Sequence, residues 1–326
     1  MNTLLPPFNA HQVFLAPWTE QMPGTGWIVL MGFLVTAACG LAGNYLILRR
    51  MALVGDALSH SVLPGIAIAF LLAQSRGTWP MFFGALTAGI TATILIEVIH
   101  KKSRVKQDAA MGIAFTSLFA LGVILISVFA ARVDLDQECV LYGEIAFVPL
   151  EPPAQWGGLP LGPPSVVRMG VVALLTLALI LMFYKELLVS SFDPGLASSL
   201  GINATVMHYG LMALLSVIIV SAFESVGAIL VIAMLILPGA TASLLSDRLP
   251  RILGLTVIHA ALSSVSGLHL ATWLDCSIAG AMVVAGSGWF VLAWVFSPRH
   301  GLLAQWWRRR RYSSDAAPME AKEVVS

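Results

Sequence analysis

Residues 49–70 read RRMALVGDALSHSVLPGIAIAF, a stretch in which two arginines give way to an apolar run that holds one aspartate and one histidine. Asp56 and His60 are four positions apart, so a helix would bring both side chains to the same face, one turn apart. Ionisable residues inside a membrane span are costly and usually face the interior of a helix bundle or a water-filled cavity. The stretch therefore predicts a membrane helix that carries an inward-facing polar site.

The composition of the 326-residue chain is that of a polytopic membrane protein. Hydrophobic residues make up 58% of it, charged residues only 11%, and the mean hydropathy is +0.87, far from the values of soluble domains. The cysteines Cys39, Cys139 and Cys276 form no CxxC pair, which argues against a disulfide framework or a zinc–thiolate site. A net charge of +1 gives no indication of a nucleic-acid partner. We expect an all-α bundle of about eight or nine transmembrane helices.

Apolar stretches of about 20 residues, the length that crosses a bilayer, mark the expected spans. The candidates stand at 27–48, 53–73, 80–99, 109–130, 166–184, 206–223, 226–245, 252–270 and 278–297. The region 206–245 is nearly continuous, which leaves the number of spans there open. Residues 1–26 are then an external N-terminal segment, 27–297 the transmembrane domain, and 298–326 a basic tail of disordered composition.

The distribution of basic residues predicts the orientation of these spans. With the N-terminus outside, only Arg76, Arg132 and Arg168 of the 18 lysines and arginines remain on the outer side. Loops that face the cytoplasm are enriched in Lys and Arg. We therefore expect the N-terminus outside and the C-terminus in the cytoplasm.

The external segment 131–165 is acidic and then rich in proline and glycine. It carries Asp134, Asp136, Glu138, Glu144 and Glu151. Such a cluster would attract cations or the basic face of a partner protein. A solvated loop without a partner is the alternative.

The cytoplasmic segment 185–203, KELLVSSFDPGLASSLGIN, contains signals for a short helix. Asp193 and Pro194 are typical of a helix start and Gly201 of a helix end. A short amphipathic helix at the membrane surface would suit docking of another subunit. A plain connector is the alternative.

Asp56 and His60 supply a carboxylate and an imidazole, which together suit a first-row divalent ion such as Mn, Fe or Zn better than Mg or Ca. The alternative is a structural hydrogen bond near the hydrated interface. Pro64 and Gly65 follow in the same span and are expected to kink it, freeing backbone carbonyls near the site.

A second group of residues lies in FESVGAILVIAMLILPGATA, residues 223–242. Glu224 falls at the outer turn between two spans and is a candidate for metal entry, although interfacial glutamates are more often only solvated. Pro238 and Gly239 are expected to kink and break the second helix. His208, His259 and His269 are each expected to be hydrogen-bonded residues of the bundle. We expect Glu97 and His100 at the inner interface beside the basic loop.

No GxxxxGK[ST] phosphate loop, HExxH helix or GxSxG elbow occurs in the sequence. If ATP drives this protein, another subunit must bind it. Two other functions remain open from the residues alone. One is a proton-coupled secondary cation carrier that uses Asp56 and His60 as a proton relay. The other is a non-transporting membrane scaffold that recruits partners.

Five blocks of the chain carry a family resemblance. They are RRMALVGDALSHSVLPGIAIAF (49–70), VDLDQECVLYGEI (133–145), SFDPGLASSLGIN (191–203), VGAILVIAMLILPGATA (226–242) and GLHLATWLDCSIAGAMVV (267–284). In order and spacing they resemble the permease subunits of manganese, zinc and iron ABC importers, the ABC-3 class. The resemblance covers roughly residues 27–297 and excludes the proline-rich insertion and the tail.

The resemblance implies a transport machine in the bacterial cytoplasmic (inner) membrane. Two permease copies, identical or sister subunits, would form the pore, cytoplasmic ABC ATPase subunits would bind beneath, and an extracytoplasmic metal-binding protein would deliver Mn²⁺, Zn²⁺ or Fe²⁺. No cofactor would be permanently bound. Asp56 and His60 match the family's intramembrane metal position, and His269, in the last block, joins Glu224 as a candidate for metal entry. The segment matching the ATPase-coupling loop contains Asp193, Pro194, Gly195, Leu200 and Gly201.

Overall fold

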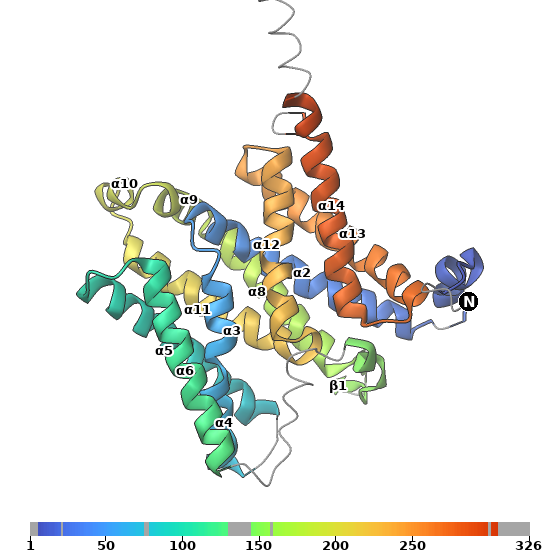
Figure 1. The fold of residues 1–326 in the computed structure, drawn as a ribbon, viewed down its shortest axis with the longest axis horizontal. Coiled ribbons are helices and arrows are strands. Elements are labelled where there is room, and N and C mark those ends of the chain that lie inside the picture. Colours follow the sequence, from blue (N-terminus) through green and yellow to red (C-terminus); the bar gives the residue numbers. More distant parts are fainter. Residues whose placement is uncertain are drawn as a thin grey trace, which may run out of the picture.

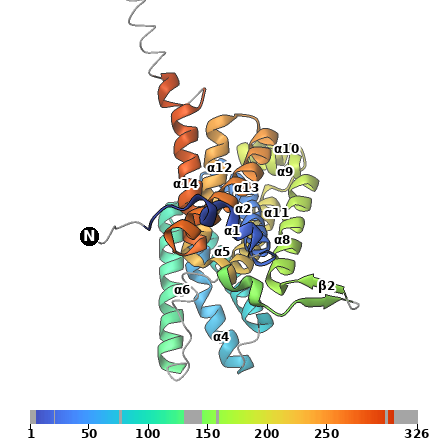
Figure 2. The same cartoon turned by 90° about the vertical axis from the view of Figure 1, so that its right-hand side faces the viewer.

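Long apolar helices make up most of the protein. The computed structural model describes residues 6–20, 22–74, 78–129, 145–156, 159–298 and 301–305. The helices are η1 (His11–Leu15), α1 (Ala16–Thr19), α2 (Gly24–Leu48), α3 (Val54–Ser61), α4 (Leu63–Ala73), α5 (Thr78–Lys102), α6 (Gln107–Phe129), η2 (Ile145–Leu150), α8 (Pro164–Met182), α9 (Tyr184–Phe192), α10 (Pro194–Ser199), α11 (Ala204–Val226), α12 (Ala228–Leu245), α13 (Leu249–Leu274) and α14 (Ile278–Phe296). The predicted all-α membrane bundle is confirmed (Figures 1 and 2).

Within the described residues, eight helices are long and apolar enough to cross a membrane. They correspond to eight of the predicted stretches, and α3 and α4 together make one span over Val54–Ala73. The remaining stretch, 226–245, corresponds to α12, of which Leu230–Leu245 forms a shorter apolar helix. The sequence left the number of spans in 206–245 open, and the structure shows two helices there, α11 and α12. They meet at Gly227, whose φ of 82° suits a glycine.

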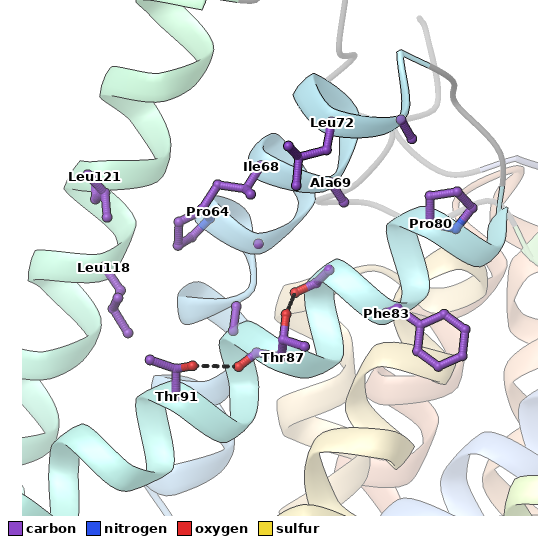
Figure 3. A pocket seen from close by; sticks show the side chains of 14 residues that line it. Pro64, Ile68, Ala69, Leu72, Pro80, Phe83, Thr87, Thr91, Leu118 and Leu121 are labelled. Carbon is purple, nitrogen blue, oxygen red and sulfur yellow. Dashed lines mark hydrogen bonds between the residues drawn. The ribbon is translucent and has the colours of Figure 1, made fainter.

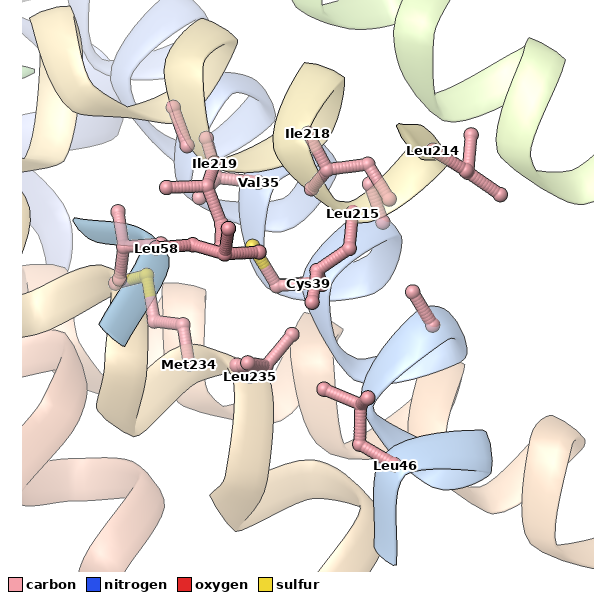
Figure 4. Close-up of a cluster of buried hydrophobic side chains, with 14 of the residues drawn as sticks. Val35, Cys39, Leu46, Leu58, Leu214, Leu215, Ile218, Ile219, Met234 and Leu235 are labelled. Atoms are coloured by element: carbon pink, nitrogen blue, oxygen red, sulfur yellow. The ribbon is translucent and has the colours of Figure 1, made fainter. Parts of the chain in front are cut away.

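Helix α2 forms the centre of the bundle and contacts α8, α11, α12 and α13. Its small residues permit close packing, because a Cβ added at Gly43 would collide with the backbone carbonyl of Leu235 on α12. Figure 4 shows the core beside it, where side chains from α2, α3, α11 and α12 interdigitate around Cys39, Leu58 and Leu215. The metal-candidate helix α3 is thereby anchored in the main core.

The predicted helix break at Pro238 is wrong. Helix α12 continues through Pro238 to Leu245. Proline cannot donate a backbone hydrogen bond, but membrane helices tolerate it where neighbouring helices enclose the site. Here α2 encloses it, since a Cβ added at Gly40 would lie 3.0 Å from the Pro238 Cβ and one at Gly239 would lie 2.8 Å from the Asn44 Oδ1.

A small antiparallel hairpin lies in the segment where we predicted an external loop. Its strands are β1 (Ala154–Trp156) and β2 (Leu159–Gly162), with Ala154 opposite Gly162. Gly162 has a φ of 100°, and the rim of Trp27 on α2 fills the space where a side chain would stand. The hairpin is therefore packed against the bundle.

Both views show α10 toward the top and the hairpin lower down, well apart from it (Figures 1 and 2). Helices α4 and α6 lie side by side at the end farthest from the C-terminal end of α14.

Candidate functional site

Helix α3 carries the candidate metal residues on a short, well-anchored element. Val54, Ala57, Leu58 and Ser61 are buried. A Cβ added at Gly55 would collide with the Leu235 side chain, so glycine allows α3 to press against α12. Asp56, in the first turn, also complements the helix dipole.

Asp56 and His60 face each other across one helical turn. The His60 Nε2 lies 3.4 Å from the Asp56 Oδ1, with 30% and 37% of the respective side chains exposed. The His60 ring lies 5.8 Å from the ring of Phe115 and 5.7 Å from that of Phe119, both on α6. The imidazole is thus held between its own helix and α6, with Nε2 directed at the carboxylate.

The separation of these two atoms suits a shared metal ion. Nitrogen and oxygen ligands at about 2.0–2.1 Å from a tetrahedral ion stand about 3.3 Å apart. A carboxylate oxygen and an imidazole nitrogen therefore lie within the reach of one ion. Pro64 has no N–H to offer the His60 carbonyl, its partner in a regular helix, and the helix is interrupted at Val62, between α3 and α4.

The candidate site does not contain a full protein ligand set. Among the residues that the structure describes, no group of three or more His, Cys, Asp or Glu side chains could hold a metal ion. Asp56 and His60 alone supply two ligands.

The candidates for metal entry lie on two different helices. Glu224 belongs to the last turn of α11, and its side chain lies outside what the structure describes. On α13, the Nδ1 of His269 lies 2.8 Å from the Val13 carbonyl, and its ring lies 5.0 Å from that of Phe14. Since a carbonyl only accepts, Nδ1 carries the proton and the Nε2 of the neutral ring keeps its lone pair. A histidine oriented by a carbonyl in this way is typical of metal ligands.

An apolar cavity of about 600 Å³ lies just beyond Pro64, between α4, α5 and α6. Figure 3 shows Pro64, Ile68, Leu118 and Leu121 around it. Its hydroxyl groups are engaged within α5, since Thr87 donates to the Gly84 carbonyl and Thr91 to the Thr87 carbonyl. The two hydroxyls are thus fixed against their own helix, and the rest of the lining consists of apolar side chains and glycines.

The predicted short helix in the segment 185–203 is present as α10. Asp193 caps it, because its Oδ1 accepts hydrogen bonds from the backbone N–H groups of Gly195 (2.9 Å) and Leu196 (3.0 Å). Pro194 opens the helix, Leu200 closes it, and Gly201 follows with a φ of 80°. The exposed Leu196 and Leu200 give it an apolar surface.

A polar cavity of about 380 Å³ adjoins this corner. Arg49, Glu97, His100, Lys101 and His208 contribute to its lining. Sequence reasoning predicted an interfacial position for Glu97 and a hydrogen-bonded one for His208, but not that they meet. The residues come from helices far apart in the chain, so no local pattern signals the group.

Comparisons with known proteins agree with this architecture. The chain matches the family model described as the ABC 3 transport family over residues 22–297. It is 46% identical over 279 residues to the manganese transport system membrane protein MntD of Bacillus subtilis, covering 86% of this chain and 94% of that protein. It is 45% identical over 278 residues to the zinc transport system membrane protein TroD of Treponema pallidum, covering 85% and 75%.

A solved structure has the same fold. The structure of PsaBC from Streptococcus pneumoniae in complex with Fab aligns with a TM-score of 0.73 at 32% identity, covering 90% of this chain and 98% of that one. The chain therefore belongs to the ABC 3 transport family, and the resemblance seen in the sequence blocks is confirmed.

Proposed function

We propose that this chain is the permease subunit of an ABC importer that moves Mn²⁺, Zn²⁺ or Fe²⁺ into the cytoplasm, with Asp56 and His60 as ligands of the ion in transit. The main observation behind this proposal is that the Asp56 carboxylate and the His60 imidazole lie 3.4 Å apart within a membrane helix of an ABC 3 family member. The ligand pair suits all three metals, whose selection depends on geometry and availability. The names of the manganese and zinc relatives support this cargo class.

Transport would proceed by alternating access. ATP can drive net movement only if the site binds the ion with different affinity in the outward- and inward-open states. With two ligands on α3, the remaining coordination would come from water or a second permease copy. A shift of α3 against its surroundings would then change the affinity for the ion.

The proposed partners follow from the faces of the molecule. Helix α10 would dock to a cytoplasmic ABC ATPase subunit, with Asp193, Pro194, Gly195, Leu200 and Gly201 shaping that element. An extracytoplasmic metal-binding protein would deliver the ion, and Glu224 and His269 would help receive it. The assembly would sit in the bacterial inner membrane with the N-terminus of this chain outside and the C-terminus in the cytoplasm.

The test is uptake of radiolabelled Mn²⁺ and Zn²⁺ into proteoliposomes that hold the full chain with its cognate ATPase and binding protein. We expect ATP-dependent uptake that the Asp56→Ala/His60→Ala double variant reduces at least tenfold. The matched control is Asp108→Ala/His100→Ala, which removes the same residue types from exposed positions at the ends of α5 and α6. The control should retain uptake.

Other outcomes would assign a different role. Uptake driven by a proton gradient without ATP would favour a secondary carrier, and no uptake of Mn²⁺, Zn²⁺ or Fe²⁺ would favour a scaffold. An equal loss of uptake in the double variant and in its control would refute Asp56 and His60 as the metal site, but it would not refute the importer.

A further inference from the structure

Arg49, at the end of α2, holds three side chains from two other helices. Its Nε donates to the Ser191 Oγ (3.0 Å) and its Nη2 to the Ser190 Oγ (3.1 Å), both on α9. Its Nη1 lies 3.3 Å from the Nδ1 of His208 on α11. Arginine only donates, so the Nδ1 of His208 must accept. One guanidinium thus connects the helix before α10 with the helix after it.

The other face of His208 continues the connection to α5. With Nδ1 as acceptor, a neutral imidazole carries its proton on Nε2, which lies 3.3 Å from the Glu97 Oε2 and donates to it. The Glu97 Oε1 in turn lies 2.6 Å from the Nζ of Lys101. A directional series of hydrogen bonds therefore runs from Arg49 through His208 to Glu97.

The members of this series are largely shielded from water. The side chains of Glu97 and His208 are 14% and 19% exposed, and burial lowers the pKa of Arg49, although a guanidinium remains protonated. Groups removed from water depend on their partners, since an unpaired buried polar group is costly. The series should therefore form or break as a unit.

A rigid turn links Arg49 to the metal-candidate helix. Arg50 adopts a left-handed φ of 57°, and the N–H groups of Arg50 and Met51 donate to the Ile47 and Leu46 carbonyls. These two bonds form a Schellman turn, in which the residue at C′ is usually glycine. Met51 is buried and its carbonyl accepts from the N–H of Val54, so α3 begins directly from the turn.

We propose that Arg49, His208 and Glu97 are positioning residues that transmit movement of the α9–α10–α11 corner to α3 and thereby to Asp56 and His60. Displacing α10 moves its two flanking helices. Arg49 then carries the displacement through the Schellman turn to α3, and Glu97 carries it to α5, which packs against α3 and α4. The inference rests on the proposed function, because it assigns an ATP-driven cause to the motion of α10.

The first test compares transport with ATP hydrolysis in proteoliposomes that hold the full chain and its cognate ATPase and binding protein. In His208→Leu and Arg49→Gln we expect the number of Mn²⁺ ions transported per ATP hydrolysed to fall at least tenfold. The rate of ATP hydrolysis should stay within twofold of the parent, and the Tm should be unchanged. His208→Gln, whose amide can accept from Arg49 and donate to Glu97, should recover part of the ratio. The matched control is His100→Leu, since His100 lines the same cavity but contacts the nearby Val105 carbonyl.

Two results would overturn the proposed mechanical relay, meaning the transmission of movement through Arg49, His208 and Glu97. One is an unchanged ratio of metal to ATP in His208→Leu. The other is a proportional loss of transport and hydrolysis in His208→Leu and His100→Leu alike, which would indicate a general structural defect. Full recovery by His208→Gln with loss in His208→Leu would strengthen it.

A second measurement separates failure of the relay from failure of the proposed function. Spin labels at Leu53→Cys, just before α3, and Phe296→Cys, at the end of α14, report the movement of α3 against a helix that is not part of the Arg49–His208–Glu97 series, with Cys139 and Cys276 replaced by serine. ATP binding should change the distance in the parent chain and leave it unchanged in His208→Leu. A nucleotide-dependent change without metal uptake would refute the importer and keep the relay. Uptake with the same distance change in parent and His208→Leu would refute the relay alone.

Discussion

Removing the Asp193 cap of α10 tests whether this helix must be formed for the ATPase to bind. The helix has six residues, too few to be stable in isolation. Its first turn depends on the Asp193 carboxylate, which accepts from the N–H groups of Gly195 and Leu196. Asp193→Ala leaves both donors without this acceptor.

The size of the effect follows from the cap alone. Loss of an N-cap side chain costs about 1 kcal/mol, which changes the ratio of formed to unformed helix about fivefold at 25 °C. If only the formed helix docks and it is marginally stable, the apparent affinity for the ATPase falls by up to about the same factor. Asp193→Asn should bind nearly as well as the parent, because asparagine caps about as well as aspartate.

Affinity of the permease in nanodiscs for the isolated ATPase subunit is the measurement. Asn203→Ala is the matched control, since Asn203 caps the much longer α11 through the N–H groups of Thr205 and Val206. We expect Asp193→Ala to bind several-fold more weakly and Asn203→Ala to bind within twofold of the parent. The reasoning is refuted if Asp193→Asn binds as weakly as Asp193→Ala, which would make the charge, and not the cap, the important property. It is equally refuted if Asp193→Ala binds normally.

Two further predictions concern helix packing and Glu151. Gly65→Ala on α4 would drive its Cβ into the Gly84 carbonyl on α5. Overpacking of this kind costs about 1–3 kcal/mol, so we expect a lower Tm in detergent. The control is Gly112→Ala on α6, which should leave the Tm unchanged or raise it, because nothing lies within 4 Å of the added Cβ. Glu151→Ala should lower the Tm, because the Glu151 Oε2 accepts from the Ser165 N–H at the start of α8 (3.0 Å). The same variant should bind the metal-binding protein with unchanged affinity. Reduced affinity at unchanged Tm would show instead that Glu151 contacts the metal-binding protein.

The features that the sequence predicted well are those governed by local rules. A bilayer requires about 20 apolar residues per span, so the spans could be placed without knowledge of packing. The ends of α10 were predictable because Asp193, Pro194 and Gly201 act on the backbone within a few residues. The closeness of Asp56 and His60 followed from helical periodicity alone.

The features that could not be predicted depend on contacts between distant segments. Arg49 and His208 are 159 positions apart, and only the packing of α2 against α11 brings them together. The break expected at Pro238 failed for the same reason, because α2 encloses α12 at that point. Glu151 looked like one of five external acids, but its carboxylate caps α8; the other four lie outside the described residues.

Helix α3, which carries Asp56 and His60, is connected to its neighbours differently at its two ends. At its start, α3 is joined to α2 by a hydrogen-bonded turn, while at its end the helix is interrupted before Pro64. A displacement entering at Arg49 would therefore reach Asp56 and His60 more directly than it would reach α4. A site with two side-chain ligands on such a helix can lose its remaining coordination through a small shift, which is the differential affinity that an importer requires.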